Sequence, residues 1–226
     1  MSSMGKGSPP AGDGPEPYIP RPRRRDVRSD SAINLNGRPL GTLADFWAWA
    51  FTDLRDNTFR GIFAEWLVAQ LLGLPMSQRG GWDCYDLTAG DKRIEVKCSS
   101  YLQPWAQRRQ TLPVYSRLFS QCWDANSDTF RPPDYNADIY VFCLQACQDA
   151  EAWDALDLTQ WQFWVLPREV LAHNKTKTLS QAGLVRLARH AYDFTQPMRA
   201  DDLSARLWPI LGPAERKSAP KDESSA

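Results

Sequence analysis

Two short stretches of alternating residues flank a turn near the middle of the chain, and they restrict the fold more than any other feature. Residues 93–99 read Arg-Ile-Glu-Val-Lys-Cys-Ser, so charged and apolar side chains alternate. Successive side chains of a strand point to opposite faces, which places the apolar set in a core and the charged set on the other face. The segment 89–92 before it is typical of a hairpin turn and follows a second candidate strand, 83–88.

The register of this hairpin brings two acids together. A turn centred on Gly90-Asp91 places Thr88 opposite Arg93, Asp86 opposite Glu95, and Cys84 opposite Lys97. Directly opposed residues have Cβ atoms about 4.5–5.5 Å apart. Two carboxylates at that distance repel each other, and one ammonium offsets only part of the cost. A hard divalent cation removes the conflict, since Mg²⁺ is usually held by one or two carboxylates and water.

A third acid lies on a helix that we expect from about residue 58 to 72, ended by Gly73. This helix is apolar on nearly every side, so we expect it to be buried, and a buried Glu65 needs a cation or a metal as partner. Two simpler interpretations stay open. The hairpin charges are also compatible with an ordinary solvent-facing hairpin, and Glu65 with a salt bridge to Arg60 or Arg93.

The order helix-Glu, strand-Asp, strand-Glu-x-Lys resembles the core of the PD-(D/E)XK nuclease superfamily, which includes restriction endonucleases, Holliday-junction resolvases and RecB-like nucleases. The resemblance covers about residues 55–107. Tyr85 stands where the family motif has proline. The resemblance implies a restriction-endonuclease-like three-layer α/β sandwich, with a mixed central sheet flanked by helices.

The resemblance also implies an activity, namely hydrolysis of phosphodiester bonds by a metal-activated water, in DNA and with 5′-phosphate products. The implied catalytic residues are Glu65, Asp86, Glu95 and Lys97. Asp86, Glu95 and Glu65 would bind Mg²⁺ or Mn²⁺, and Lys97 would position the attacking water. The alternatives are a catalytically inactive nuclease-fold module that binds nucleic acid or protein, and an unrelated α/β interaction module.

Downstream of the hairpin, two glutamines are similar to the auxiliary glutamine of RecB-like and resolvase-like members, and Gln103 and Gln107 both remain candidates. Aromatic and basic residues nearby are candidates for base stacking and phosphate contacts. The nucleic-acid-binding candidates are Gln103, Trp105, Gln107, Arg108 and Arg109. The alternative is a helix N-terminus with an aromatic core contact.

The rest of the chain shows one domain between two tails. Residues 1–32 and 213–226 are predicted to be disordered, and 33–212 to form the nuclease-like domain. We expect a helix capped by Thr42 or Asp45 and a helix over part of 105–122. Strands are expected at 138–146 and 161–166, and short helices near 167–172, 180–191 and 200–208.

Composition limits the binding partners and the cellular compartment that we expect. Lys and Arg balance Asp and Glu at 27 each, so any contact with a polyanion must come from local patches. The five cysteines form no CxxC pair, which favours reduced cysteines in a cytoplasmic protein. No stretch is long and apolar enough for a membrane span or a secretory signal. The expected partner is DNA, with no membrane, and a homodimer or a larger defence or repair complex stays open.

Overall fold

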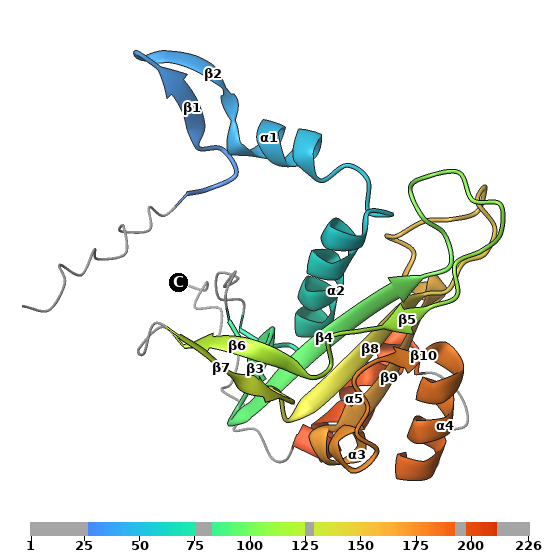
Figure 1. Cartoon of the computed structure of the whole chain (residues 1–226). Helices are drawn as coiled ribbons and strands as arrows, with labels where there is room; N and C mark the ends of the chain where they lie inside the picture. The colour runs from blue at the N-terminus through green and yellow to red at the C-terminus, as the bar shows by residue number, and fades with distance from the viewer. Residues whose placement is uncertain (1–26, 76–82, 125–128, 193–197, 212–226) are drawn as a thin grey trace, which may run out of the picture. The chain divides into compact units, whose positions relative to one another are not determined.

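The computed structural model describes residues 27–75, 83–124, 129–192 and 198–211, and the chain divides into two compact units, Met1–Ala50 and Phe51–Ala226 (Figure 1). The predicted tails fall largely outside the described residues, at 1–26 and 213–226. The first of them is predicted to reach residue 32, but Ala32 already begins a strand.

The first unit contains a hairpin that the sequence did not predict, followed by a helix. Strands β1 (Ala32–Leu35) and β2 (Arg38–Thr42) are antiparallel, and Asn36 and Gly37 turn with φ of 51° and 81°, as hairpin turns of the primed types require. Helix α1 (Leu43–Ala50) begins as predicted. The backbone N–H of Thr42 donates to Asp45 Oδ2 at 2.7 Å, and that of Asp45 to Thr42 Oγ1 at 3.2 Å, which satisfies two donors at the helix start.

The second unit is a mixed α/β fold built on a four-stranded sheet. The strands are β3 (Leu87–Ala89), β4 (Lys92–Ser100), β8 (Ile139–Gln145) and β9 (Trp161–Pro167), in the order β3-β4-β8-β9. β4 and β8 are parallel, and the outer pairs are antiparallel. The mixed α/β character and the predicted strands 138–146 and 161–166 are therefore confirmed.

Each face of this sheet carries its own core. Val141 of β8 and Ile94 of β4 belong to the cluster that contains Leu67 of α2 (Asn57–Leu71) and Leu203 of α5 (Ala200–Leu211). The alternate residues of β8, such as Tyr140, belong to the second cluster, which includes residues of α3 (Arg168–His173) and α4 (Gln181–Tyr192). The period of two along a buried strand explains why one strand serves both cores.

Helix α2 begins and ends close to the predicted bounds. Asp56 Oδ1 accepts from the backbone N–H of Thr58 at 2.8 Å and so caps the first turn. At the other end, Gly73 has φ of 63°, and the N–H of Leu74 donates to Ala69 O at 2.9 Å. This is the pattern of a Schellman C-terminus, for which glycine is the preferred residue.

The helix predicted over part of 105–122 is wrong. The segment holds β5 (Val114–Tyr115), paired with β10 (Leu179–Ser180), and β6 (Ser120–Asp124), paired with β7 (Thr129–Asp134). Pro113 lacks the N–H that a helix interior needs. β5 pairs with a strand far along the chain, which local propensity does not encode, whereas β6 pairs with the strand that follows it. A short 3-10 turn, η1 (Leu158–Gln160), leads into β9.

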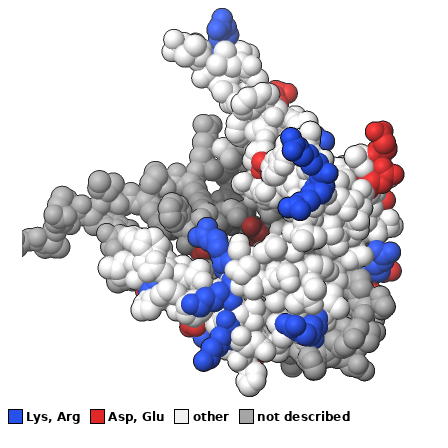
Figure 2. Space-filling view, turned by 45° about the vertical axis from the view of Figure 1, so that its right-hand side comes forward, with Lys and Arg blue, Asp and Glu red and all other residues white. Residues whose placement is uncertain are grey.

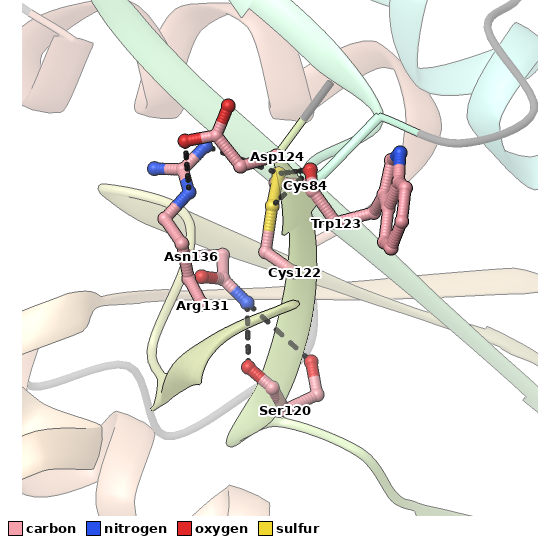
Figure 3. The surroundings of a disulfide bond; sticks show 7 residues. All are labelled: Cys84, Ser120, Cys122, Trp123, Asp124, Arg131 and Asn136. Atoms are coloured by element: carbon pink, nitrogen blue, oxygen red, sulfur yellow. Dashed lines mark hydrogen bonds and ion pairs between the residues drawn. A yellow bond between two sulfur atoms is a disulfide. The ribbon is translucent and has the colours of Figure 1, made fainter. Parts of the chain in front are cut away.

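The cysteine expectation is wrong for two of the five residues. Cys84 and Cys122 form a disulfide with Cα atoms 5.3 Å apart, which joins the segment before β3 to β6 (Figure 3). An ion pair between Arg131 and Asp124 lies beside it, at 3.5 Å. The remaining cysteines, Cys98, Cys143 and Cys147, are free thiols. Cys84 and Cys122 are 38 residues apart, so no local sequence motif predicts that they form a disulfide.

No helix among the described residues is long and apolar enough to cross a membrane.

Candidate active site

The hairpin that carries the acids has the predicted register where β3 and β4 pair. Thr88 lies opposite Arg93, across a two-residue turn whose Gly90 has φ of 61°. Strand β3 is shorter than predicted, however, because it begins only at Leu87. Cys84 lies in a bend and is bonded to Cys122, so the expected pairing of Cys84 with Lys97 does not form.

Asp86 stands one residue before β3 and is held against β4 by two hydrogen bonds. Its backbone N–H donates to Ile94 O at 3.0 Å, and its Oδ2 accepts from the backbone N–H of Val96 at 2.7 Å. The carboxylate thus takes the place of the ladder carbonyl that a longer β3 would supply. The paired register ends at Leu87 opposite Ile94, so the predicted strand pair of Asp86 with Glu95 does not form, although the charge of Glu95 acts on Asp86.

Glu95 and Lys97 lie on one face of β4, and Ile94 and Val96 are buried on the other. Lys97 Nζ is 2.5 Å from Glu95 Oε1, and the two side chains are only 21% and 16% exposed. In the register with β8, Glu95 lies beside Tyr140. A largely buried ion pair next to a second acid is a demanding arrangement, because each charge loses hydration.

The pKa of Asp86 is raised to about 7, first by burial and then by the negative charges of Glu95 and Glu65. The Val96 N–H and the Lys97 ammonium act in the opposite direction. Burial also raises the pKa of Glu95, against the lowering effect of Lys97. Neighbouring acids therefore disfavour a second negative charge here, and an added cation would relieve the conflict.

Glu65 belongs to the same group of charges. It is half-buried on α2, and its charge raises the pKa of both Asp86 and Glu95. The two arginines considered as alternative partners have partners of their own: Arg60 donates to Asn57 and to the Arg55 carbonyl, and Arg93 forms an ion pair with Asp138 at 2.7 Å. The charges of Glu65, Glu95 and Lys97 thus all act on Asp86, although α2 packs on the Ile94 and Val96 face of β4 and Lys97 lies on the other face.

Arg117 is a residue near this group that the sequence did not suggest. Its positive charge is among the causes that lower the pKa of Glu95, against the dominant effect of burial. Arg117 is exposed and has φ of 59°. Because 105–122 was expected to be partly helical, nothing in the local pattern indicated that this loop returns to β4.

The downstream candidates organise the loop that follows β4. Gln103, which is buried, donates from Nε2 to Ser100 O at 3.2 Å, and its backbone N–H donates to Gln107 Oε1 at 2.8 Å. Gln107 Nε2 donates to Tyr101 O at 3.2 Å. Both glutamines therefore act locally as loop supports. Their role in nucleic-acid binding stays a prediction.

The same loop borders a cavity of about 720 Å³. Gln103, Trp105 and Gln107 line it, opposite residues 52–55 and 153–156. Trp105 is 59% exposed, and Arg108 and Arg109 are also exposed. An exposed indole is available for stacking, and the roles predicted for Trp105, Arg108 and Arg109 stay predictions too.

The carboxylate oxygens of Glu65, Asp86 and Glu95, here called the acidic group, are ligands that suit a hard cation with few protein ligands. In the described part of the chain, no three His, Cys, Asp or Glu residues are arranged to hold a metal ion. Asp86 and Glu95 each use one oxygen in the contacts above, which leaves Oδ1 and Oε2 as further donors. Mg²⁺ and Mn²⁺ accept such sites because water completes their coordination.

No protein-family model, curated protein or solved structure matches this chain.

Proposed function

We propose that this chain is a metal-dependent nuclease that hydrolyses phosphodiester bonds in DNA. The same proposal includes a restriction-endonuclease-like arrangement of the second unit, for which the order of α2, β3 and β4 along the chain is the support. The acidic group of Glu65, Asp86 and Glu95, with Lys97, is the proposed catalytic centre.

One observation carries the proposal: Asp86 and Glu95 are both half-buried, and the pKa of Asp86 is raised to about 7 by burial and by the charges of Glu95 and Glu65, against the lowering effect of Lys97. A second negative charge is therefore unfavourable in this group, and a divalent ion would stabilise it. Neighbouring half-buried acids with raised pKa values are common at functional sites.

Each residue has a stated role in this proposal. Asp86 and Glu95 would hold Mg²⁺ or Mn²⁺ through carboxylate oxygens, and Glu65 would support the site from α2. When bound, such an ion supplies a water of lowered pKa and neutralises charge on the phosphoryl oxygens. Lys97 would orient the attacking water and stabilise the charge that develops on phosphorus-bound oxygen.

The proposed reaction is a simple hydrolysis. A water oxygen forms a bond to phosphorus, and the bond between phosphorus and the 3′ oxygen breaks. One water proton is lost to the surroundings, and the leaving 3′ oxygen takes up a proton. The products are one 5′-phosphate and one 3′-hydroxyl, and no oxidant or co-substrate is required.

The test is nicking of supercoiled plasmid DNA with Mg²⁺ or Mn²⁺, and with EDTA. We expect nicking that EDTA abolishes and that Lys97→Ala slows by about 100-fold or more, the usual loss when one stabilising group of a transition state is removed. Lys92→Ala is the matched control, because Lys92 lies on the same strand and pairs with the exposed Asp91. It should retain the wild-type rate.

Equal rates for wild type and Lys97→Ala would contradict the catalytic assignment. DNA binding without any metal-dependent nicking would favour the inactive nuclease-fold module instead. Circular dichroism of each variant separates a lost function from a lost fold.

A further inference from the structure

We propose that Arg117 and Lys177 form a phosphate-binding rim for nucleic acid beside the acidic group. This basic rim extends the proposed function, on which it rests, by naming the residues that hold the substrate backbone. The argument begins with the position of the loop between β5 and β6.

The loop between β5 and β6 is hydrogen-bonded to Tyr140, the residue of β8 that pairs with Glu95. Tyr140 of β8 lies beside Glu95 in the parallel register, and its hydroxyl donates to Leu118 O at 3.2 Å. Leu118 is 1% exposed and belongs to the core on that face. Because Arg117 immediately precedes this anchor, its side chain starts close to the face that carries Glu95 and Lys97.

A second loop brings Lys177 to the same place. The backbone N–H of Leu118 donates to Lys177 O at 3.2 Å, and Lys177 Nζ lies 5.1 Å from the ring centroid of Phe119. Lys177 is exposed. Arg117 and Lys177, which are 60 residues apart in the sequence, thus both lie next to Leu118 and Phe119. Several Lys and Arg side chains lie close together on the face of the molecule that Figure 2 shows.

The backbone of Arg117 adopts an unfavourable conformation. Its φ of 59° lies in the left-handed region, which a residue with a Cβ rarely adopts. The buried Tyr115 and Leu118 hold the loop in this conformation from both sides. Backbone strain that the surrounding structure maintains is commonly found at functional sites. Arg117 is exposed, and its charge acts on Glu95.

Three arginines of the second unit already have acidic partners. Arg93, Arg131 and Arg168 each form an ion pair with an aspartate. Within the residues that the structure describes, Arg117 has no acidic partner inside ion-pair distance. An incoming phosphodiester brings new negative charge, which Arg117, whose charge acts on Glu95, and Lys177, which is bonded to the same loop, can balance.

The experiment measures binding of a labelled DNA duplex by fluorescence anisotropy at several salt concentrations, with Ca²⁺ in place of Mg²⁺. The variants are Arg117→Gly, which suits the positive φ, Arg117→Lys, which keeps the charge, and Lys177→Gln. Arg186→Gln is the control, because Arg186 is an exposed arginine on α4. Nicking with Mg²⁺ is measured in parallel.

We expect Arg117→Gly and Lys177→Gln each to weaken binding severalfold and to reduce the salt slope by about one, as for the loss of one phosphate contact. Arg117→Lys should keep the slope, and Arg186→Gln should match wild type. If wild type nicks DNA while Arg117→Gly and Lys177→Gln bind like Arg186→Gln, the basic rim is wrong and the proposed nuclease stands. If wild type binds through Arg117 but never nicks, the rim stands and the hydrolysis is wrong. Absence of any binding overturns both.

Discussion

Among single residues, Asp86 links the local geometry to the proposed chemistry. Its side chain accepts the hydrogen bond that a longer β3 would have taken from Val96, so the half-buried carboxylate is held in place. Burial and the charges of Glu95 and Glu65 then raise its pKa to about 7. In the proposed site, a divalent cation would stabilise the ionised form of Asp86.

The raised pKa predicts how stability depends on pH. The pKa of folded Asp86 is about 7, so it retains its proton up to that pH, whereas an unfolded aspartate loses its proton near the ordinary pKa of 3.8. The folded state therefore binds more protons between these values, and this group makes the protein less stable as pH rises through that window. We expect Asp86→Asn to flatten the loss of melting temperature between pH 5 and 7.5, as followed by circular dichroism.

Divalent metal gives the complementary measurement. Mg²⁺ should raise the melting temperature of wild type more at pH 7.5 than at pH 5, because protonation competes with metal binding. An equal rise in Asp86→Asn would show that the ion binds elsewhere. Asp138, whose pKa is lowered to about 2 by its hydrogen bonds with Arg93, titrates well below this window and does not confuse the result.

At the scale of elements, helix α2 positions Glu65 against the sheet. Its buried face, which includes Ala64, Leu67 and Val68, packs on Ile94 and Val96 of β4. The Asp56 cap and the Gly73 terminus set where the helix begins and ends. A shift of one residue along the helix would rotate Glu65 by about 100° away from its place, so the caps contribute to the site as well as to the fold.

Removal of the cap should therefore cost stability. We expect Asp56→Ala to lower the free energy of unfolding by about 1 kcal/mol, because Asp56 Oδ1 no longer satisfies the N–H of Thr58. Urea denaturation gives the value. Asp30→Ala is the control, since Asp30 is an exposed residue of the first unit, and a loss no larger than its own would contradict the cap.

For the molecule as a whole, the disulfide connects regions that are separated in sequence. Cys84 precedes Asp86 by two residues, and Cys122 lies on β6. The bond thus ties the segment that carries Asp86 to the β6–β7 hairpin. It closes a loop of 38 residues, and cross-links of that size restrict the unfolded chain substantially.

Opening this disulfide should destabilise the second unit. We expect the double variant Cys84→Ser, Cys122→Ser to lose about 2–4 kcal/mol of unfolding free energy relative to wild type, while Cys147→Ser, at a free and half-buried thiol, changes little. Thiol titration of unfolded, unreduced protein should find three thiols. Five would show that the disulfide is absent.

The sequence alone determined the features that depend on neighbouring residues. The β3–β4 register follows from a glycine turn and strict alternation, and the bounds of α2 follow from Asp56, its apolar run and Gly73. The strands β8 and β9 follow from continuous apolar residues. In each case the signal and the structure lie within one segment, so local stereochemistry suffices.

Only the tertiary structure decided what depends on distant partners. The β5–β10 pair, the Cys84–Cys122 bond and the contact of Tyr140 with Leu118 all join segments that are far apart in the sequence. Local propensity favours a helix over part of 105–122, and the pairing of β5 with β10 overrides it there. The hairpin pattern indicates Asp86, Glu95 and Lys97, and the apolar helix indicates Glu65, while the cations near them are set by the folded chain, because electrostatic neighbours depend on distance in space.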